Sequence, residues 1–129
     1  MEIPKQVKAP VKFSGFISEL FHARIQIHIA HVQTKSYAQH IALDSFYNDI
    51  VGLTDGLIET WQGRYGIVTG YTLKNVQDNV NVIFYLTTLL DYINNSRLTL
   101  FSDDSDLHNQ VDNIKTLINT TIYKLKYLQ

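Results

Sequence analysis

Four stretches of this sequence repeat apolar residues at spacings of three and four, and this periodicity constrains the fold more than any other feature. Such spacing aligns the apolar side chains along one face of an α-helix. The predicted helices cover about 13–33, 37–64, 76–95 and 107–125. Because each helix must bury its apolar face against another, four of them joined by short links predict an all-α, antiparallel four-helix bundle.

Capping and helix-breaking residues mark the ends of these segments. Ser36 precedes the second predicted helix and has the side chain of a helix N-cap. Gly66 and Gly70 follow that helix, and they predict a crossover over 66–70 between the second and third helices. The acidic cluster Asp103, Asp104 and Asp106 predicts a cap for the fourth helix, whose positive N-terminal end attracts carboxylates.

The length and composition fit one domain, which we assign to 1–129 with an N-terminal extension over 1–12. Apolar residues make up 45% of the chain, but no apolar run reaches the roughly 18 residues that a transmembrane helix needs. The extension lacks the apolar core of a secretory signal. We therefore expect a soluble, cytoplasmic protein with no membrane partner.

Composition also excludes several functions. Cysteine is absent, which excludes disulfides, thiolate metal sites and a cysteine nucleophile, and leaves nitrogen and oxygen as the strong metal ligands. The formal net charge of -1 gives no case for nucleic-acid binding, which depends on neutralising many phosphates. A nucleophile elbow, a Gly-rich phosphate loop and a dinucleotide-binding fingerprint are also missing. If the chain is an enzyme, its chemistry is predicted to depend on a metal.

Four side chains that can bind a metal lie on one face of the second predicted helix. They fall at about 0°, 40°, 60° and 100° around the helix axis. In chain order they are His40, Asp44, Asp55 and Glu59. A face of this kind can hold metal ions or can be a polar stripe exposed to solvent, and helix geometry alone favours neither.

The distance along the helix adds a further constraint. Asp44 and Asp55 are eleven residues apart, and a rise of about 1.5 Å per residue separates them by roughly 16 Å. One ion cannot contact both residues. If all four side chains bind one kind of metal, the His40 end of one helix must meet the Glu59 end of a second, antiparallel copy. We therefore predict a two-fold dimer with two equivalent sites.

The first predicted helix supplies more nitrogen ligands near its end. His28 and His31 are three residues apart and lie on adjacent turns. His31 and His40 should lie at the same level along the bundle, because both are close to the turn between the helices. His28 should lie one helical turn further from that turn. Either histidine can complete the metal site. By contrast, we predict that His22 and His108 are surface or interface residues.

This pattern resembles that of the Dps-type mini-ferritins. That family carries one His on its first helix and four ligands on its second: a His and an Asp four residues apart, then, eleven residues later, an Asp and a Glu four residues apart. The present chain has the same spacing for the four ligands of the second helix. The matching residues are His40, Asp44, Asp55 and Glu59. The likeness extends through Leu43, Phe46 and the glycines after the helix, and covers about half of the chain. The last two predicted helices match only as amphipathic helices.

The resemblance implies an antiparallel ferritin-like four-helix bundle that acts as a ferroxidase. In that family two subunits bind Fe(II) between them, the electrons pass to peroxide or dioxygen, and Fe(III) is stored inside a shell of twelve subunits. His40 and Asp44 would come from one subunit, and Asp55 and Glu59 from its neighbour. We therefore expect iron as the bound metal, with zinc as a substitute, and further copies of this chain as the partners.

The resemblance leaves the ligand from the first helix open. His28 keeps the family's separation of twelve residues from His40, whereas His31 takes the family's place if the connecting loop is three residues shorter. We favour His31. The chain departs from the family at Val32, where Trp is usual, and at Thr60, where Arg is usual. It also lacks the basic tail with which some members hold DNA.

Two segments, 31–40 and 61–66, are also similar to ferritin-like proteins predicted in large tailed phages. This similarity raises a viral origin, with the host cytoplasm or the virion as the location. It also raises an alternative function, a non-catalytic ferritin-like structural or virion-associated oligomer whose acids and histidines only pair across an interface. A second alternative is a bundle in which the same residues bind a structural zinc ion.

Overall fold

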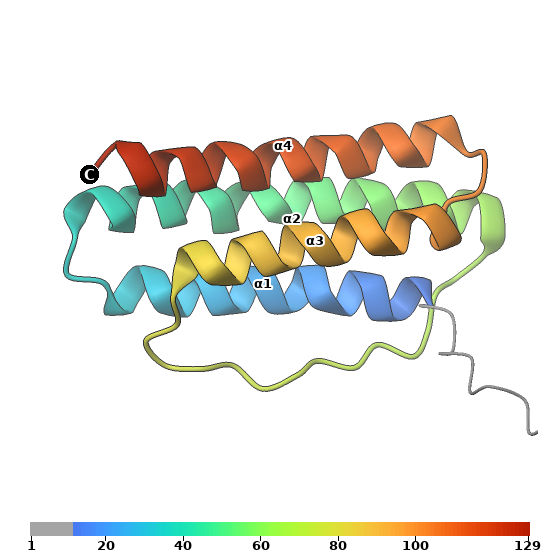
Figure 1. Cartoon of the computed structure of the whole chain (residues 1–129). Helices are drawn as coiled ribbons and strands as arrows, with labels where there is room; N and C mark the ends of the chain where they lie inside the picture. The colour runs from blue at the N-terminus through green and yellow to red at the C-terminus, as the bar shows by residue number, and fades with distance from the viewer. Residues whose placement is uncertain (1–11) are drawn as a thin grey trace, which may run out of the picture.

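The computed structural model describes residues 12–129, which form four α-helices and no strand. The helices are α1 (Phe13–Gln33), α2 (Tyr37–Tyr65), α3 (Val82–Leu100) and α4 (Ser105–Tyr127). They lie side by side as a four-helix bundle (Figure 1), which confirms the predicted all-α class and the number of helices. The predicted N-terminal extension lies outside the described residues except for Lys12, the N-cap of α1.

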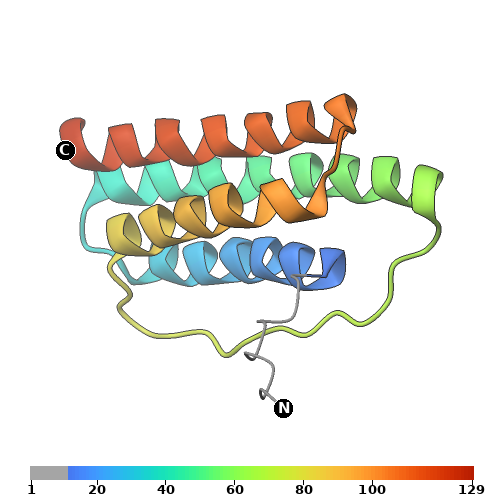
Figure 2. The ribbon, with the colours of Figure 1, turned by 45° about the vertical axis from the view of Figure 1, so that its right-hand side comes forward.

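Neighbouring helices in the bundle run antiparallel. Helix α2 packs against α1 and α4, and α3 packs against the same two helices from the opposite corner (Figure 1). Helices α2 and α3 therefore lie on a diagonal and point in the same direction. Figure 2 shows how the chain achieves this, because the segment 66–81 runs back beside α1 before α3 begins. None of the four helices has the length and apolar character needed to cross a membrane.

The connection between α2 and α3 differs from the sequence prediction. The predicted crossover ended at Gly70 and the third helix was expected from Val76 to about Asn95, but α3 begins at Val82 and continues to Leu100. The prediction was wrong because residues 76–81 bind side chains of α1 instead of forming a helical turn. The link between α2 and α3 therefore runs along the full length of α1 and is not the short link that was predicted.

A row of four polar side chains on α1 holds this segment, and we call it the polar row. Its members are Ser18, His22, Gln26 and Gln33. The N–H of Thr72 donates to Ser18 Oγ at 3.0 Å, and Gln26 exchanges two hydrogen bonds of 2.8 Å with the backbone of Gln77. The N–H of Asn79 donates to Gln33 Oε1 at 2.9 Å. These bonds satisfy backbone groups that helical pairing would otherwise satisfy.

Two asparagines fix the point at which α3 begins. Asn79 has φ 55°, a left-handed conformation that asparagine tolerates better than most residues. Asn81 is the N-cap of α3, and its side-chain oxygen accepts from the N–H of Phe84 at 3.0 Å. The helix therefore starts after Asn81, although the apolar spacing continues further towards the N-terminus.

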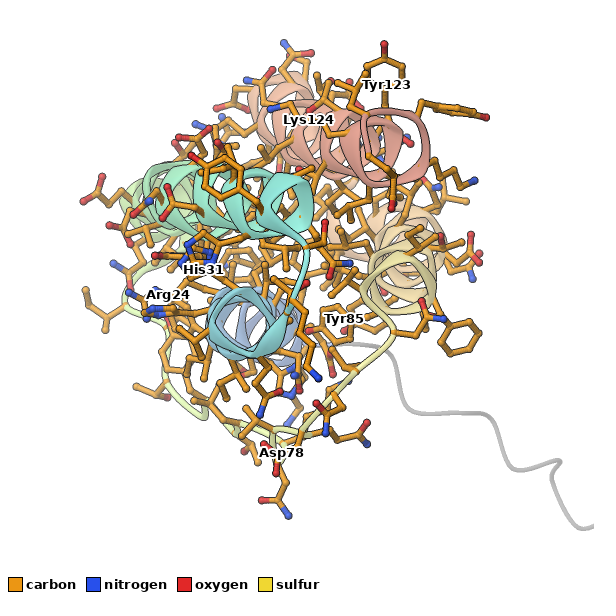
Figure 3. The ribbon with its side chains drawn as sticks, turned by 90° about the vertical axis from the view of Figure 1, so that its left-hand side faces the viewer. Arg24, His31, Asp78, Tyr85, Tyr123 and Lys124 are labelled. Atoms are coloured by element: carbon orange, nitrogen blue, oxygen red, sulfur yellow. The ribbon has the colours of Figure 1, made fainter. Side chains whose placement is uncertain are left out.

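His22 belongs to the polar row and is buried, so the prediction of a surface or interface position was wrong. Its Nε2 donates to the backbone oxygen of Asn75 at 3.0 Å, and its Nδ1 accepts from the hydroxyl of Tyr85 at 2.7 Å. Burial raises the pKa of Tyr85, which keeps the phenol protonated as a donor. Figure 3 shows Tyr85 between α1 and α3. The histidine therefore joins three parts of the fold.

The acidic cluster before α4 also differs from its predicted role. Asp104 is the N-cap residue of α4, but its carboxylate makes no cap hydrogen bond. Instead it accepts hydrogen bonds from Arg64 and from the hydroxyl of Tyr65, at the end of α2. Arg64 also bonds to Asp106 at 3.0 Å. These acids thus join α2 to α4, and a charged partner replaces the predicted cap.

An aromatic cluster fills the core at this end of the bundle. Phe13 stacks on Trp61 with ring centroids 4.0 Å apart. Phe101 is fully buried and meets Phe13, Phe16 and Trp61 edge to face. Beside it, half-buried His108 accepts from Arg97 and donates to backbone oxygens. His108, predicted to be a surface or interface residue, therefore packs within the α3–α4 end while it stays partly exposed.

Candidate metal site

The turn between α1 and α2 brings His31 and His40 into direct contact. Ser36 caps α2, because its Oγ accepts from the N–H of Gln39 at 3.2 Å, as the sequence predicted. The two imidazole rings stack with centroids 3.6 Å apart and planes inclined by 19°. His31 Nδ1 bonds to the backbone oxygen of His40 at 2.7 Å, and His40 Nδ1 bonds to that of His31 at 2.8 Å. The short loop therefore fixes both rings.

These reciprocal bonds determine where the ring protons lie. A carbonyl oxygen only accepts hydrogen bonds, so Nδ1 of each ring must carry the hydrogen. In the neutral ring Nε2 then keeps a free lone pair, the form in which histidine binds a metal. Metal-binding histidines in proteins commonly donate their other N–H to a carbonyl or a carboxylate, which orients the ring. His31 and His40 have this arrangement.

A second group lies beside this pair and contains His28 and Asp44. His28 stacks on Tyr47 of α2, with ring centroids 4.1 Å apart and planes inclined by 15°. The hydroxyl of Tyr47 donates to Asp44 Oδ1 at 2.9 Å. The centroids of His28 and His31 are 6.1 Å apart. The structure thus gathers His28, His31, His40 and Asp44 in one region where α1 faces α2.

Asp55 and Glu59 lie further along α2, and both are exposed. Asp55 is eleven residues from Asp44 on one continuous helix, so the separation of roughly 16 Å expected from helix geometry holds. Within residues 12–129 of a single chain, no three His, Asp or Glu side chains lie close enough together to hold a metal ion. His28, His31, His40 and Asp44 therefore share one region of the bundle without forming a three-ligand site in a single chain, and Asp55 and Glu59 lie apart from them.

A hollow of about 430 Å³ lies further along α1 and α2, and Asp55 is part of its lining. Its lining is mainly apolar and comes from α1, α2 and the 66–81 segment: Leu20, Phe21, Ile25, Ile50, Val51 and Leu73. Arg24, Thr54 and Asp55 add polar groups, and Thr54 Oγ1 is buried with no hydrogen-bond partner among residues 12–129. Figure 3 shows Arg24 and His31 on the same side of the bundle, where α1 meets α2.

Sequence reasoning missed Tyr47 and Arg24. Tyr47 follows His40 by seven residues and Asp44 by three, which places it on the same helix face. Arg24 precedes His28 by four residues, and its guanidinium carbon lies 5.9 Å from the centre of the Tyr47 ring. Extending the ligand face by one helical turn would have found both, but tyrosine is so frequent in packed interiors that its spacing alone indicates no site.

The sequence was compared with protein families, curated proteins and solved structures. Neither the curated proteins nor the solved structures include a match to this chain. A protein-family model does match, over residues 31–125, and it is described as a family of unknown function, DUF5856. The matched range contains His31, His40, Asp44, Asp55 and Glu59. Because it covers most of the sequence, the chain belongs to the DUF5856 family.

Proposed function

We propose that this protein is an iron-binding ferroxidase of the mini-ferritin type, which oxidises Fe(II) between two subunits and stores or detoxifies Fe(III). The observation that carries the proposal is the reciprocal pairing of His31 and His40. Both Nδ1 atoms are bound to backbone oxygens, which leaves two preoriented Nε2 atoms as nitrogen ligands. A core histidine whose two nitrogens were both bonded within the fold, as in His22, would offer no such ligand.

The spacing on α2 supports a site shared by two chains. Along the sequence, the midpoint of His40 and Glu59 falls between residues 49 and 50, and the midpoint of Asp44 and Asp55 falls at the same place. If two α2 helices pack antiparallel about this centre, the imidazole end of each meets the carboxylate end of the other, twice per dimer. The apolar hollow, with Ile50 in its lining, lies at the same level of the helix. Burial of this surface would favour the association.

The ligand set suits oxidation of iron as a substrate. Imidazole nitrogen and carboxylate oxygen bind both Fe(II) and Fe(III), and the negative charge of the carboxylates stabilises the more highly charged product. Each Fe(II) gives up one electron and peroxide accepts two, so two Fe(II) and one H2O2 consume two protons and give two Fe(III) and two H2O.

Within this proposal His31 is the ligand from α1. It stacks directly on His40 and has a free Nε2, whereas His28 stacks on Tyr47. The 66–81 segment would be the crossover of a ferritin-like bundle, and a shell of twelve copies would enclose the stored Fe(III). The His31→Ala variant should therefore lose iron oxidation, and His28→Ala should lose less of it.

The deciding experiment adds Fe(II) anaerobically and then peroxide or dioxygen, with Fe(III) formation followed by absorbance. The test variant is the double substitution His40→Ala, Glu59→Ala. Asp49→Ala is the control, because it removes an exposed carboxylate from α2 on the side opposite His40. Wild type and control should oxidise iron at the same rate, and the double variant should be no faster than iron in buffer.

The same experiment separates the alternatives. Equal, slow oxidation by wild type and by the double variant would reject the ferroxidase and leave the non-catalytic oligomer or the zinc-binding bundle. A structural zinc ion would then show itself as bound metal whose removal lowers the unfolding temperature. Sedimentation of the wild-type chain as a monomer at micromolar concentration would contradict every shared-site arrangement.

A further inference from the structure

We propose that Tyr47 is a positioning residue of the metal site, which holds Asp44 through its hydroxyl and the α1 histidines through its ring. This inference rests on the proposed function, because it concerns the same site. Tyr47 was not among the ligands predicted from the sequence, and its role would be to orient ligands without binding the metal itself. Its contacts join ligands of α1 to a ligand of α2.

The hydroxyl group acts on Asp44. It donates to Asp44 Oδ1 at 2.9 Å, while Oδ2 and the second lone pair of Oδ1 remain available to a metal ion. A half-buried carboxylate with a fixed hydrogen bond has fewer orientations than a free one, so less conformational freedom is lost when the metal binds. A carboxylate only accepts hydrogen bonds, so the phenol hydroxyl is the donor in this contact.

The aromatic ring acts on the histidines. One face stacks on His28 at 4.1 Å, and the ring meets His31 edge to face with centroids 5.2 Å apart. Arg24 lies 5.9 Å from the ring centre, where its positive charge is attracted by the π system. These contacts limit the rotation of His31 about its side-chain bonds, in addition to its bond with the His40 backbone.

Removal of the hydroxyl alone separates positioning from packing. Tyr47→Phe keeps the ring and its contacts with the histidines but deletes the donor to Asp44. Tyr65→Phe is a matched control, because Tyr65 is on the same helix and its hydroxyl also donates to an aspartate, Asp104, at the far end of α2. Both substitutions delete one oxygen atom, so a general effect of losing a tyrosine hydroxyl would appear in both.

The probe is Co(II) titrated into the full-length protein without oxygen, with its visible ligand-field spectrum recorded. Loss of a group that orients a ligand commonly weakens metal binding by about 10- to 100-fold, and we expect a loss of this size and a changed spectrum for Tyr47→Phe. Tyr65→Phe should bind as wild type does. In an Asp44→Ala background Tyr47→Phe should have no further effect on affinity, because the hydroxyl then has no ligand to orient.

The outcomes distinguish this inference from the proposed function. If wild type neither binds Co(II) nor oxidises Fe(II), the proposed function fails and the role of Tyr47 fails with it. If wild type does both while Tyr47→Phe, with an unchanged unfolding temperature, binds Co(II) with wild-type affinity and spectrum, only the role of Tyr47 is overturned. Weakening by Tyr47→Phe that persists in the Asp44→Ala background would also overturn it, since the hydroxyl would then act on something else.

Discussion

The site that we propose between two copies of this chain predicts how a mixture of two variants, each inactive alone, should behave. The first variant, His40→Ala with Asp44→Ala, loses the imidazole end of α2. The second, Asp55→Ala with Glu59→Ala, loses the carboxylate end. In a dimer of either variant alone, each of the two sites lacks half of its α2 ligands, so neither variant should oxidise Fe(II) faster than buffer.

The expected recovery follows from the arrangement of the four side chains. In a mixed dimer, the intact imidazole end of the second variant meets the intact carboxylate end of the first, which restores one complete site. The other site of that dimer lacks all four ligands. Random pairing of equal amounts makes half of the dimers mixed, so the mixture should regain about a quarter of the wild-type activity. Asp55 and Glu59 are exposed, whereas His40 and Asp44 are half-buried, so the fold of the first variant is checked by circular dichroism before the mixing experiment.

The assay is Fe(III) formation after the two variants have been co-expressed with different affinity tags, which isolate assemblies that contain both variants. A single mixed dimer should have about half of the wild-type activity, since one site of two is complete, and a larger shell of random composition should have about a quarter. If isolated mixed dimers are as inactive as the separate variants, the imidazole and carboxylate ends do not meet across a two-fold axis. If either variant is fully active alone, the four side chains do not form one site.

Three further predictions concern the fold. Gln26→Leu should lower the free energy of unfolding by about 1–3 kcal/mol in urea titrations, because both hydrogen bonds to Gln77 are lost; an unchanged midpoint would mean that the 66–81 segment is held by other contacts. Phe101→Ala should cost about 3–5 kcal/mol by the same measurement, because a fully buried ring leaves a cavity; a cost below about 1 kcal/mol would contradict its place in the core. The hydrogen bond from Arg97 lowers the pKa of Asp112 below its ordinary value of 3.8, so stability from this pair is present above that pH and is lost as the pH falls through the lowered value. Asp112→Asn should therefore flatten the loss of thermal stability as the pH falls below 3.8, and an unchanged acid profile would assign that loss to other carboxylates.

Residues that pack through apolar spacing could be predicted from the sequence. Helix α1 and helix α2 end within a residue or two of their predicted bounds, since both the periodicity and the Ser36 cap are local signals. The start of α3 could not be predicted in this way. Val76 continues the apolar spacing, yet its surroundings form an extended segment because Gln26 and Gln33 bind the neighbouring backbone. That competition depends on side chains about fifty positions away.

In the candidate site, too, some features could be predicted from sequence spacing and others could not. Sequence spacing placed His40 and Asp44 on one face of α2, and the structure has both beside the histidines of α1. Spacing could not reveal that His31 and His40 bond to each other's backbone, because this depends on the path of the loop 34–36. It also misassigned His22, whose partners come from the 66–81 segment and α3. Contacts between elements that are distant in sequence therefore account for the errors at His22 and at the start of α3.

Dimer formation and metal binding are coupled in the proposed arrangement, because the complete ligand set exists only in the dimer. A ligand that binds one state alone stabilises it by RT ln(1 + [L]/Kd), which is about 2.7 kcal/mol per site at a hundredfold excess over Kd. Two sites would then contribute about 5 kcal/mol, comparable to a change of nearly four orders of magnitude in the dimer dissociation constant. The apolar lining around Ile50 need therefore supply only a modest affinity by itself. Iron availability would set the extent of assembly, and assembly would in turn complete the site that oxidises the iron.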